Sequence, residues 1–212
     1  MKPVVLGITG KACAGKDRYA KVFEELGARL IDVDRLGHQA LEANQNRIIA
    51  EFGDSIEHQG TIDRKALGAI VFSDPSRLKA LEGISHPWMV ARIEEILAEE
   101  TADAIVLNAA LLSRMGLDRL CSHVLFITAP RCIRFRRCKA RDGLSWEQFL
   151  KREASQRDIT FRSIDPNAAR YRLRNWGSTE IIHRQVRRCC VRIGFKRCSL
   201  SSAAKTAKEA SN

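Results

Sequence analysis

The chain has 212 residues and a mass of 23.8 kDa, which fits one compact domain with small insertions and argues against two large independent domains. Hydrophobic residues make up 45% and charged residues 29%, a composition that excludes a fibrous or intrinsically disordered chain. The formal net charge of +11 brings anionic partners, such as phosphates and nucleic acid, into consideration.

The first elements predict a strand, a tight turn, a helix and a second strand. Residues 4–8 are apolar and rich in β-branched side chains, and Gly10 ends the run. Apolar residues recur at helical spacing from Lys16 onward, and Gly27 is a suitable stop. Residues 30–33 predict the second strand, because they form another short apolar run.

The remaining elements alternate between helical and strand patterns. Between residues 35 and 100 the pattern is helical, with Gly53, Gly60, Pro75 and Pro87 as expected interruptions, which indicates a helical insertion. Strands are predicted at residues 104–107, 123–128 and 171–174, helices at about 130–158, and a last helix capped by Ser178. Alternating strands and helices indicate a parallel sheet covered on both faces.

The two chain ends carry little functional information. Residues 183–212 hold eight Lys or Arg and one Glu, which is +7 of the total charge. Such a tail can bind nucleic acid, bind a membrane surface or be a solvated end, and we favour the solvated end. Residues 1–10 fit neither a signal peptide nor a membrane span, so we expect a cytoplasmic protein with neither a membrane nor nucleic acid as partner.

Seven cysteines are present, without the paired C-x-x-C spacing of zinc or redox sites. In a cytoplasmic protein we expect these thiols to be reduced. Cys189 and Cys190, with Cys198 beyond them, could bind a metal, but no fourth ligand is evident and we do not expect a site there.

The strongest chemical signal is a G-x-x-x-x-G-K pattern between the first strand and the first helix. In this pattern, backbone N–H groups and the positive end of the helix dipole bind phosphate oxygens, and the lysine reaches the outer phosphates. The candidate binding residues are Gly10, Lys11, Ala12, Cys13, Ala14, Gly15, Lys16, Asp17 and Arg18.

The eighth position of the pattern departs from the usual hydroxyl residue. Asp17 stands there, and a carboxylate beside phosphates repels them unless a cation lies between. Either Asp17 contacts the metal directly or the site is weakened. We favour direct contact and take Asp17 as the metal ligand, because Lys11 and Arg18 add positive charge nearby.

Two further groups of charged residues are candidates for catalysis. Asp32 and Asp34 end the second strand, where ligands bind in open α/β sheets, and either could orient a hydroxyl group or instead cap the next helix. For Asp34 we favour the catalytic role. Six basic residues lie between Arg131 and Arg141, and arginines on a helical flap can clamp a transferring phosphoryl group, with Arg141 as the best candidate.

These residues resemble the dephospho-coenzyme A kinase family from about residue 5 to residue 186. No single motif is decisive, but their order and spacing together are specific. Besides the phosphate loop, the matching blocks are Ile31-Asp32-Val33-Asp34, Gly60-Thr61-Ile62-Asp63-Arg64, Val71-Phe72, Leu81-Glu82-Gly83-Ile84-Ser85-His86-Pro87, Arg141-Asp142-Gly143-Leu144-Ser145 and Asn175-Trp176-Gly177-Ser178.

The resemblance implies an α/β fold of the P-loop NTPase type, three-layered (α/β/α) with a five-stranded parallel sheet. The implied parts are a nucleotide-binding core (1–34, 104–130 and 166–190), a helical coenzyme A-binding insertion (35–103), a lid (131–165) and a basic, flexible tail (191–212).

The resemblance also implies that ATP and Mg²⁺ donate the γ-phosphate to the ribose 3′-hydroxyl of dephospho-coenzyme A. Carried over by position, Lys16 holds the phosphates, Asp34 is the base and Arg141 stabilises the transferring group. His86 faces the acceptor or is a buried structural histidine. A different small-molecule P-loop kinase and a catalytically silent binding protein are the alternatives.

The chain departs from the family pattern G-G-I-G-S-G-K-S/T at Lys11, Cys13 and Asp17. The usual D-I-P-L-L-F-E stretch is replaced by residues 108–114, and the acid that the family carries at its first position is Asn108 here. Charge is therefore removed at Asn108 and added at Asp17. Our hypothesis is that one carboxylate substitutes for the other.

Overall fold

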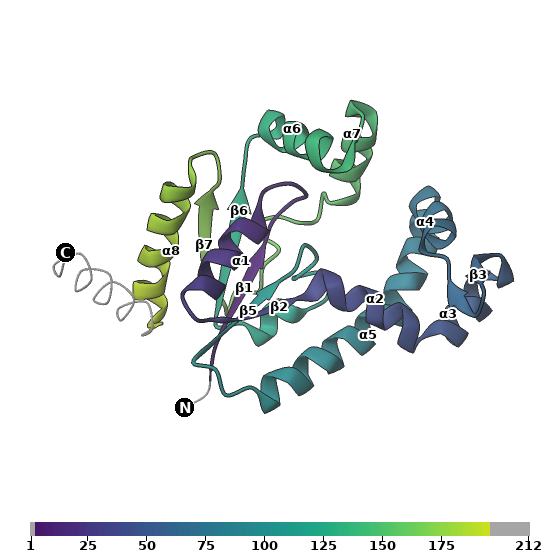
Figure 1. Cartoon of the computed structure of the whole chain (residues 1–212), viewed down its shortest axis with the longest axis horizontal. Coiled ribbons are helices and arrows are strands. Elements are labelled where there is room, and N and C mark those ends of the chain that lie inside the picture. Colours follow the sequence, from purple (N-terminus) through teal and green to yellow (C-terminus); the bar gives the residue numbers. More distant parts are fainter. Residues whose placement is uncertain (1–2, 196–212) are drawn as a thin grey trace, which may run out of the picture. The chain divides into compact units, whose positions relative to one another are not determined.

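The computed structural model of the protein describes residues 3–195 (Figure 1). By its internal contacts the chain forms two compact units, one up to Ile31 and from Thr101 onward, the other from Asp32 to Glu100. Most of the predicted flexible tail lies outside the described residues. None of the helices in residues 3–195 has the length and hydropathy needed to cross a membrane.

The first unit is built on a five-stranded parallel sheet with the order β2-β5-β1-β6-β7. The central strand β1 pairs in parallel with β5 and β6, and β6 pairs in parallel with β7. The predicted fold class is thereby confirmed. The elements are β1 (Val4–Thr9), α1 (Lys16–Glu25), β2 (Arg29–Asp32), β5 (Ala104–Asn108), η2 (Leu117–Leu120), β6 (His123–Thr128), α6 (Arg131–Asp142), α7 (Trp146–Ser155), β7 (Ala169–Arg174) and α8 (Thr179–Ile193).

Side-chain alternation along β1 divides the core between the two faces of the sheet. Leu6 and Ile8 are fully buried in the cluster that β1 shares with α1 and α8. Gly7 points to the other face, where a Cβ atom would crowd Leu112 and Cys121. Because both faces are covered, β1 is held rigidly, and so is the loop that follows it.

The second unit is mainly helical. Two of its helices begin after an aspartate whose side chain accepts hydrogen bonds from the first turn, Asp63 for α4 and Asp74 for α5. The elements are α2 (Val33–Ala43), α3 (Gln45–Phe52), η1 (Asp54–Ile56), β3 (Glu57–His58), β4 (Thr61–Ile62), α4 (Arg64–Ser73) and α5 (Pro75–Glu99).

An interruption expected from the sequence is absent. Pro87 was expected to interrupt the helical pattern, but α5 continues through it from Pro75 to Glu99. Residues on both sides of the proline, Ser85 before it and Met89 and Ile93 after it, are buried. Burial of this shared face offsets the hydrogen bond that proline removes, so tertiary packing overrides the local preference.

The end of the last helix, which the sequence left open, is set by a glycine. Helix α8 stops at Ile193, and Gly194 adopts a left-handed conformation with φ 73°. Its buried face, which includes Ile182 and Val186, packs into the same cluster as α1. The end of α8 is therefore a regular glycine C-cap.

Tyr19 joins α1 to α8 through a buried hydroxyl group. The hydroxyl donates to Gln185 Oε1 at 2.7 Å, and burial raises the pKa of Tyr19 to about 12. We expect Tyr19→Phe to lower the free energy of unfolding by about 1 kcal/mol, because Gln185 loses its donor. Urea denaturation measures the change, and Tyr171→Phe, whose hydroxyl lies 3.5 Å from His123 Nδ1, is the control with a smaller effect.

Candidate functional site

The predicted phosphate loop connects the end of β1 to the start of α1, and glycines at both of its ends are required by close packing. Gly10 has φ 147°, and a Cβ atom there would overlap the carbonyl oxygen of Ile127. Gly15 has φ 88° and lies against the side chain of Asn175. Both glycines of the G-x-x-x-x-G-K pattern are thus fixed by the fold.

The outer side of the loop is held by hydrogen bonds to its carbonyl groups. The Asn175 side chain, which is fully buried, donates to the Ala14 carbonyl at 2.7 Å. Arg137 donates to the same carbonyl at 3.2 Å and to the Asn175 carbonyl at 3.0 Å. Within residues 3–195 the N–H groups of Cys13 and Gly15 have no hydrogen-bond acceptor, so they are available to an anion.

Lys16 is a charged residue at the end of the loop, where α1 begins. It is 8% exposed, yet its ammonium group has no hydrogen bond or ion pair to any residue that the structure describes. It also stands in the first turn of α1, where the helix dipole is positive. A buried cation without a counter-charge is costly, and a bound phosphate would supply that counter-charge.

Asp17 and Asn108 meet at the carboxyl end of the central strands. Asn108 ends β5, is 4% exposed and donates from Nδ2 to Asp17 Oδ1 at 2.8 Å. Its Oδ1 atom is buried and has no hydrogen-bond partner among the described residues. A carboxylate and an unsatisfied amide oxygen side by side are ligands that Mg²⁺ prefers, so this pair fits a divalent cation beside the loop.

Helix α6 places its arginines differently from the sequence prediction. Arg141, the predicted phosphate clamp, forms a two-point ion pair with Asp142 at 2.7 and 3.0 Å. Together with Arg152, and despite partial burial, it lowers the pKa of Asp142 to about 2. The arginine that reaches the phosphate loop is Arg137, which the sequence analysis did not single out.

The sequence did contain a signal that could have identified Arg137. It lies four residues before Arg141, so the two arginines share a face of the predicted helix. Arg18, which the sequence analysis placed in the loop site, donates to Thr179 Oγ1 at 3.0 Å and to Asn175 Oδ1 at 3.5 Å. In this state it braces the start of α8.

A cavity of about 380 Å³ lies beside the loop. Its charged lining contains three cations and one anion, so a negatively charged ligand is favoured there. The lining residues that carry charge are Lys11, Arg131, Arg134 and Glu153. Ala14, the end of β6 and residues 159–161 also line the cavity, in agreement with ligand binding at the carboxyl ends of parallel strands.

The other predicted site residues belong to the second unit. Asp32 is the N-cap of α2 and accepts from the Arg35 N–H at 3.2 Å, which is the capping role considered for it. Asp34 lies in the first turn of α2 and is exposed. His86 is half-buried in α5. The catalytic role of Asp34 and the acceptor role of His86 stay predictions.

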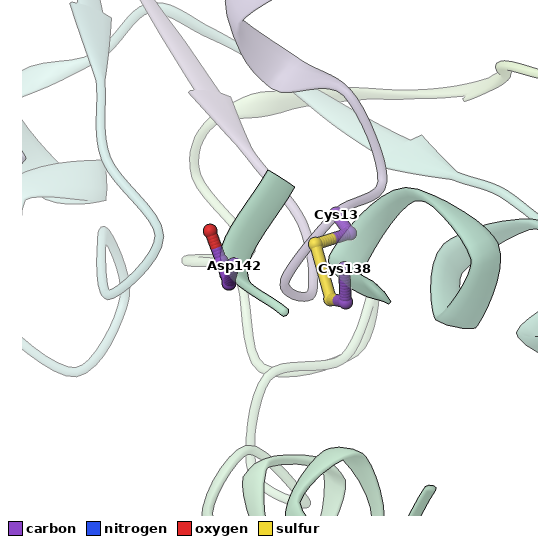
Figure 2. Close-up of side chains that lie close together, drawn as sticks. All are labelled: Cys13, Cys138 and Asp142. Atoms are coloured by element: carbon purple, nitrogen blue, oxygen red, sulfur yellow. A yellow bond between two sulfur atoms is a disulfide. The ribbon is translucent and has the colours of Figure 1, made fainter. Parts of the chain in front are cut away.

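The expectation of reduced thiols is wrong for one pair, because Cys13 and Cys138 form a disulfide between the loop and α6 (Figure 2). Cys13 has φ 57°, a left-handed conformation that costs a residue other than glycine about 1 kcal/mol. That backbone conformation explains the glycine that the family pattern has at this position. The adjacent Ala12 N–H donates to Gln156 Oε1 at 2.8 Å.

Comparison with known proteins identifies one family. The family model described as dephospho-CoA kinase matches residues 4–179. Dephospho-CoA kinase of Thermus thermophilus is 34% identical over 87% of this chain and 89% of its own length. Dephospho-CoA kinase of Borreliella burgdorferi is 35% identical over 62% of this chain, and the match spans only 65% of that protein.

A solved structure agrees with the sequence comparison. The crystal structure of TT1252 from Thermus thermophilus superimposes with a TM-score of 0.74 at 32% identity. The superposition covers 91% of this chain and 98% of that one. The likeness therefore extends over nearly the whole fold.

Glu153 of α7 anchors Arg134 of α6 through a nearly buried ion pair, in which the side chains are 11% and 8% exposed. The hydrogen bond from Arg134 lowers the pKa of Glu153 from its usual 4.5, although burial opposes the shift. We expect Glu153→Gln to lower the free energy of unfolding by about 2 kcal/mol at pH 7, because the buried Arg134 loses its counter-charge.

This contribution depends on pH in a defined direction. A carboxyl group whose pKa is lower in the folded state stabilises the fold above its unfolded pKa, and the effect is lost as the pH falls below that value. The difference between wild type and Glu153→Gln in urea denaturation should therefore shrink below about pH 4.5. Glu147→Gln on the exposed face of the same helix is the control, and an equal loss there would contradict the assignment.

Proposed function

Because the chain belongs to the dephospho-CoA kinase family, we propose that it transfers the γ-phosphate of ATP to the ribose 3′-hydroxyl of dephospho-CoA. The products are ADP and coenzyme A, and the reaction is the last step of coenzyme A biosynthesis. The proposed location is the cytoplasm.

The observation that carries the proposal is the unpaired ammonium group of Lys16 in the loop. Lys16 binds the outer phosphates of ATP, and the free N–H groups of Cys13 and Gly15 bind their oxygens. Phosphoryl transfer needs this arrangement, because catalysis consists mainly of positioning the phosphates and stabilising their charge. The excess of cations around the neighbouring cavity supports the same ligand.

The oxygen atoms of Asp17 and Asn108 fit Mg²⁺. When bound, Mg²⁺ neutralises negative charge on the phosphates. The family pattern has a hydroxyl residue at position 17 and an acid at position 108, so in this chain the carboxylate stands at the start of α1 instead of at the end of β5. The 2.8 Å hydrogen bond between the two side chains supports a shared role, with the total charge of the pair unchanged.

In this proposal the acceptor, dephospho-CoA, is bound by the helical insertion and by Asp34 immediately before it. Asp34 is the base that accepts the proton of the 3′-hydroxyl, and His86 contributes to binding the acceptor. Residues 35–103 bind the coenzyme, and residues 131–165 form the lid. Arg137 fixes the loop from the lid helix, whereas Arg141 stabilises the transferred group after it leaves Asp142.

The activity is tested by following ADP release from purified protein in a coupled assay with ATP, Mg²⁺ and dephospho-CoA. We expect turnover with this acceptor and none without it, and we expect Lys16→Met to lower kcat/KM by about a hundredfold or more. Mass spectrometry of the acceptor product identifies the phosphorylated hydroxyl. Turnover with another acceptor only, or ATP binding without turnover, would overturn the proposal.

The relocated carboxylate is tested by moving it back. Asp17→Asn should abolish turnover and weaken Mn²⁺ binding in the nucleotide complex, because the only charged ligand of the pair is removed. The double variant Asp17→Ser with Asn108→Asp restores the family arrangement and should recover both. Mn²⁺ binding is measured by electron paramagnetic resonance, and unchanged Mn²⁺ affinity in Asp17→Asn would refute the shared role.

A further inference from the structure

The phosphate loop is joined covalently to α6. Cys13 lies in the middle of the loop and Cys138 on α6, 125 positions later, and their Cα atoms are 5.7 Å apart (Figure 2). Three other cysteines, Cys121, Cys132 and Cys189, are free thiols within residues 3–195. The pairing is therefore selective.

The fold holds the two sulfur atoms together through packing that does not depend on the bond itself. Cys138 is fully buried, and both cysteines lie in a small cluster with Phe149, Phe135 and Leu144. Reduction would leave two thiols already facing each other, so the bond can form again without rearrangement of the chain.

A metal site at the same place is disfavoured. The two sulfur atoms and a carboxylate oxygen of Asp142 lie within 4.8 Å of one another. Asp142, however, accepts hydrogen bonds from Arg141 and Arg152, both at 2.7 Å. A cation there would face two guanidinium groups, whereas a disulfide carries no charge.

We propose that Cys13 and Cys138 form a reversible thiol–disulfide switch, in which the oxidised state ties the loop to the lid and slows nucleotide exchange. The inference rests on the proposed binding of nucleotide phosphates by the loop. When the disulfide is present, two consecutive loop residues are attached to this part of the chain. Cys13 is bonded to Cys138 of α6, and the Ala12 N–H donates to Gln156 just after α7. Lid opening, which often limits product release, would have to strain this connection.

The oxidant is a low-molecular-weight disulfide, RSSR. The Cys13 thiolate attacks one sulfur atom of RSSR and expels RS⁻, and the Cys138 thiolate then attacks Cys13 Sγ and expels the second RS⁻. The two cysteines are oxidised by two electrons in total, and RSSR takes up these electrons and the two protons to give two RSH. A dithiol reverses both steps. Cytosolic disulfides are usually of this transient kind.

The test compares full-length protein after treatment with glutathione disulfide or dithiothreitol. Peptide mapping should recover a Cys13–Cys138 linked peptide only after oxidation. Release of a fluorescent ADP analogue, followed by stopped flow, should be about tenfold slower in the oxidised protein and should recover with dithiothreitol. Cys138→Ala should abolish this response, and Cys132→Ala, on an exposed position of the same helix, should retain it.

Two results would overturn the switch. One is that the linked peptide does not form at oxidant concentrations that modify Cys132. The other is that the peptide forms but ADP release is equally fast in both states. Because the readout is nucleotide release, it is independent of the acceptor: a redox response without phosphorylation of dephospho-CoA would defeat the proposed function alone.

Discussion

The site depends on the hydrogen bond between the Asn175 side chain and the Ala14 carbonyl. Asn175 follows β7, at one edge of the sheet, and the loop follows the central strand β1. The bond fixes the Ala14 carbonyl, while the neighbouring N–H groups of Cys13 and Gly15 have no acceptor among residues 3–195. Because Asn175 is fully buried, its amide group has no water to compete for it, and the loop is preorganised for an anion.

Helix α6 holds the same loop through a second set of contacts. Its Arg137 shares the Ala14 carbonyl with Asn175, its Cys138 is bonded to Cys13, and its Arg134 is anchored to α7 by Glu153. The loop is thus attached on one side to the sheet and on the other to a pair of helices. Such an arrangement couples the loop to α6 and α7 through several separate contacts.

Local patterns were enough to predict the parallel sheet, its five strands and the glycine-flanked turn between β1 and α1, but they missed the short strands β3 and β4. The strand runs are apolar and short, and the two loop glycines have the spacing that the turn requires. The pairing of Cys13 with Cys138, and that of Asp17 with Asn108, join residues far apart in sequence that only the tertiary fold brings together. At Pro87 the local pattern predicted an interruption, but burial of one face of α5 outweighs the helix-breaking tendency of proline.

Under the proposed function, the carboxylate at position 17 affects which form of the nucleotide the protein accepts. A triphosphate without its divalent ion would meet the negative charge of Asp17 at close range, next to the very amides that should receive it. A hydroxyl group, as in the family pattern, imposes no such repulsion. Asp17 would then discriminate against the metal-free nucleotide, and the concentration of free divalent ion would help to set how much usable substrate the protein encounters.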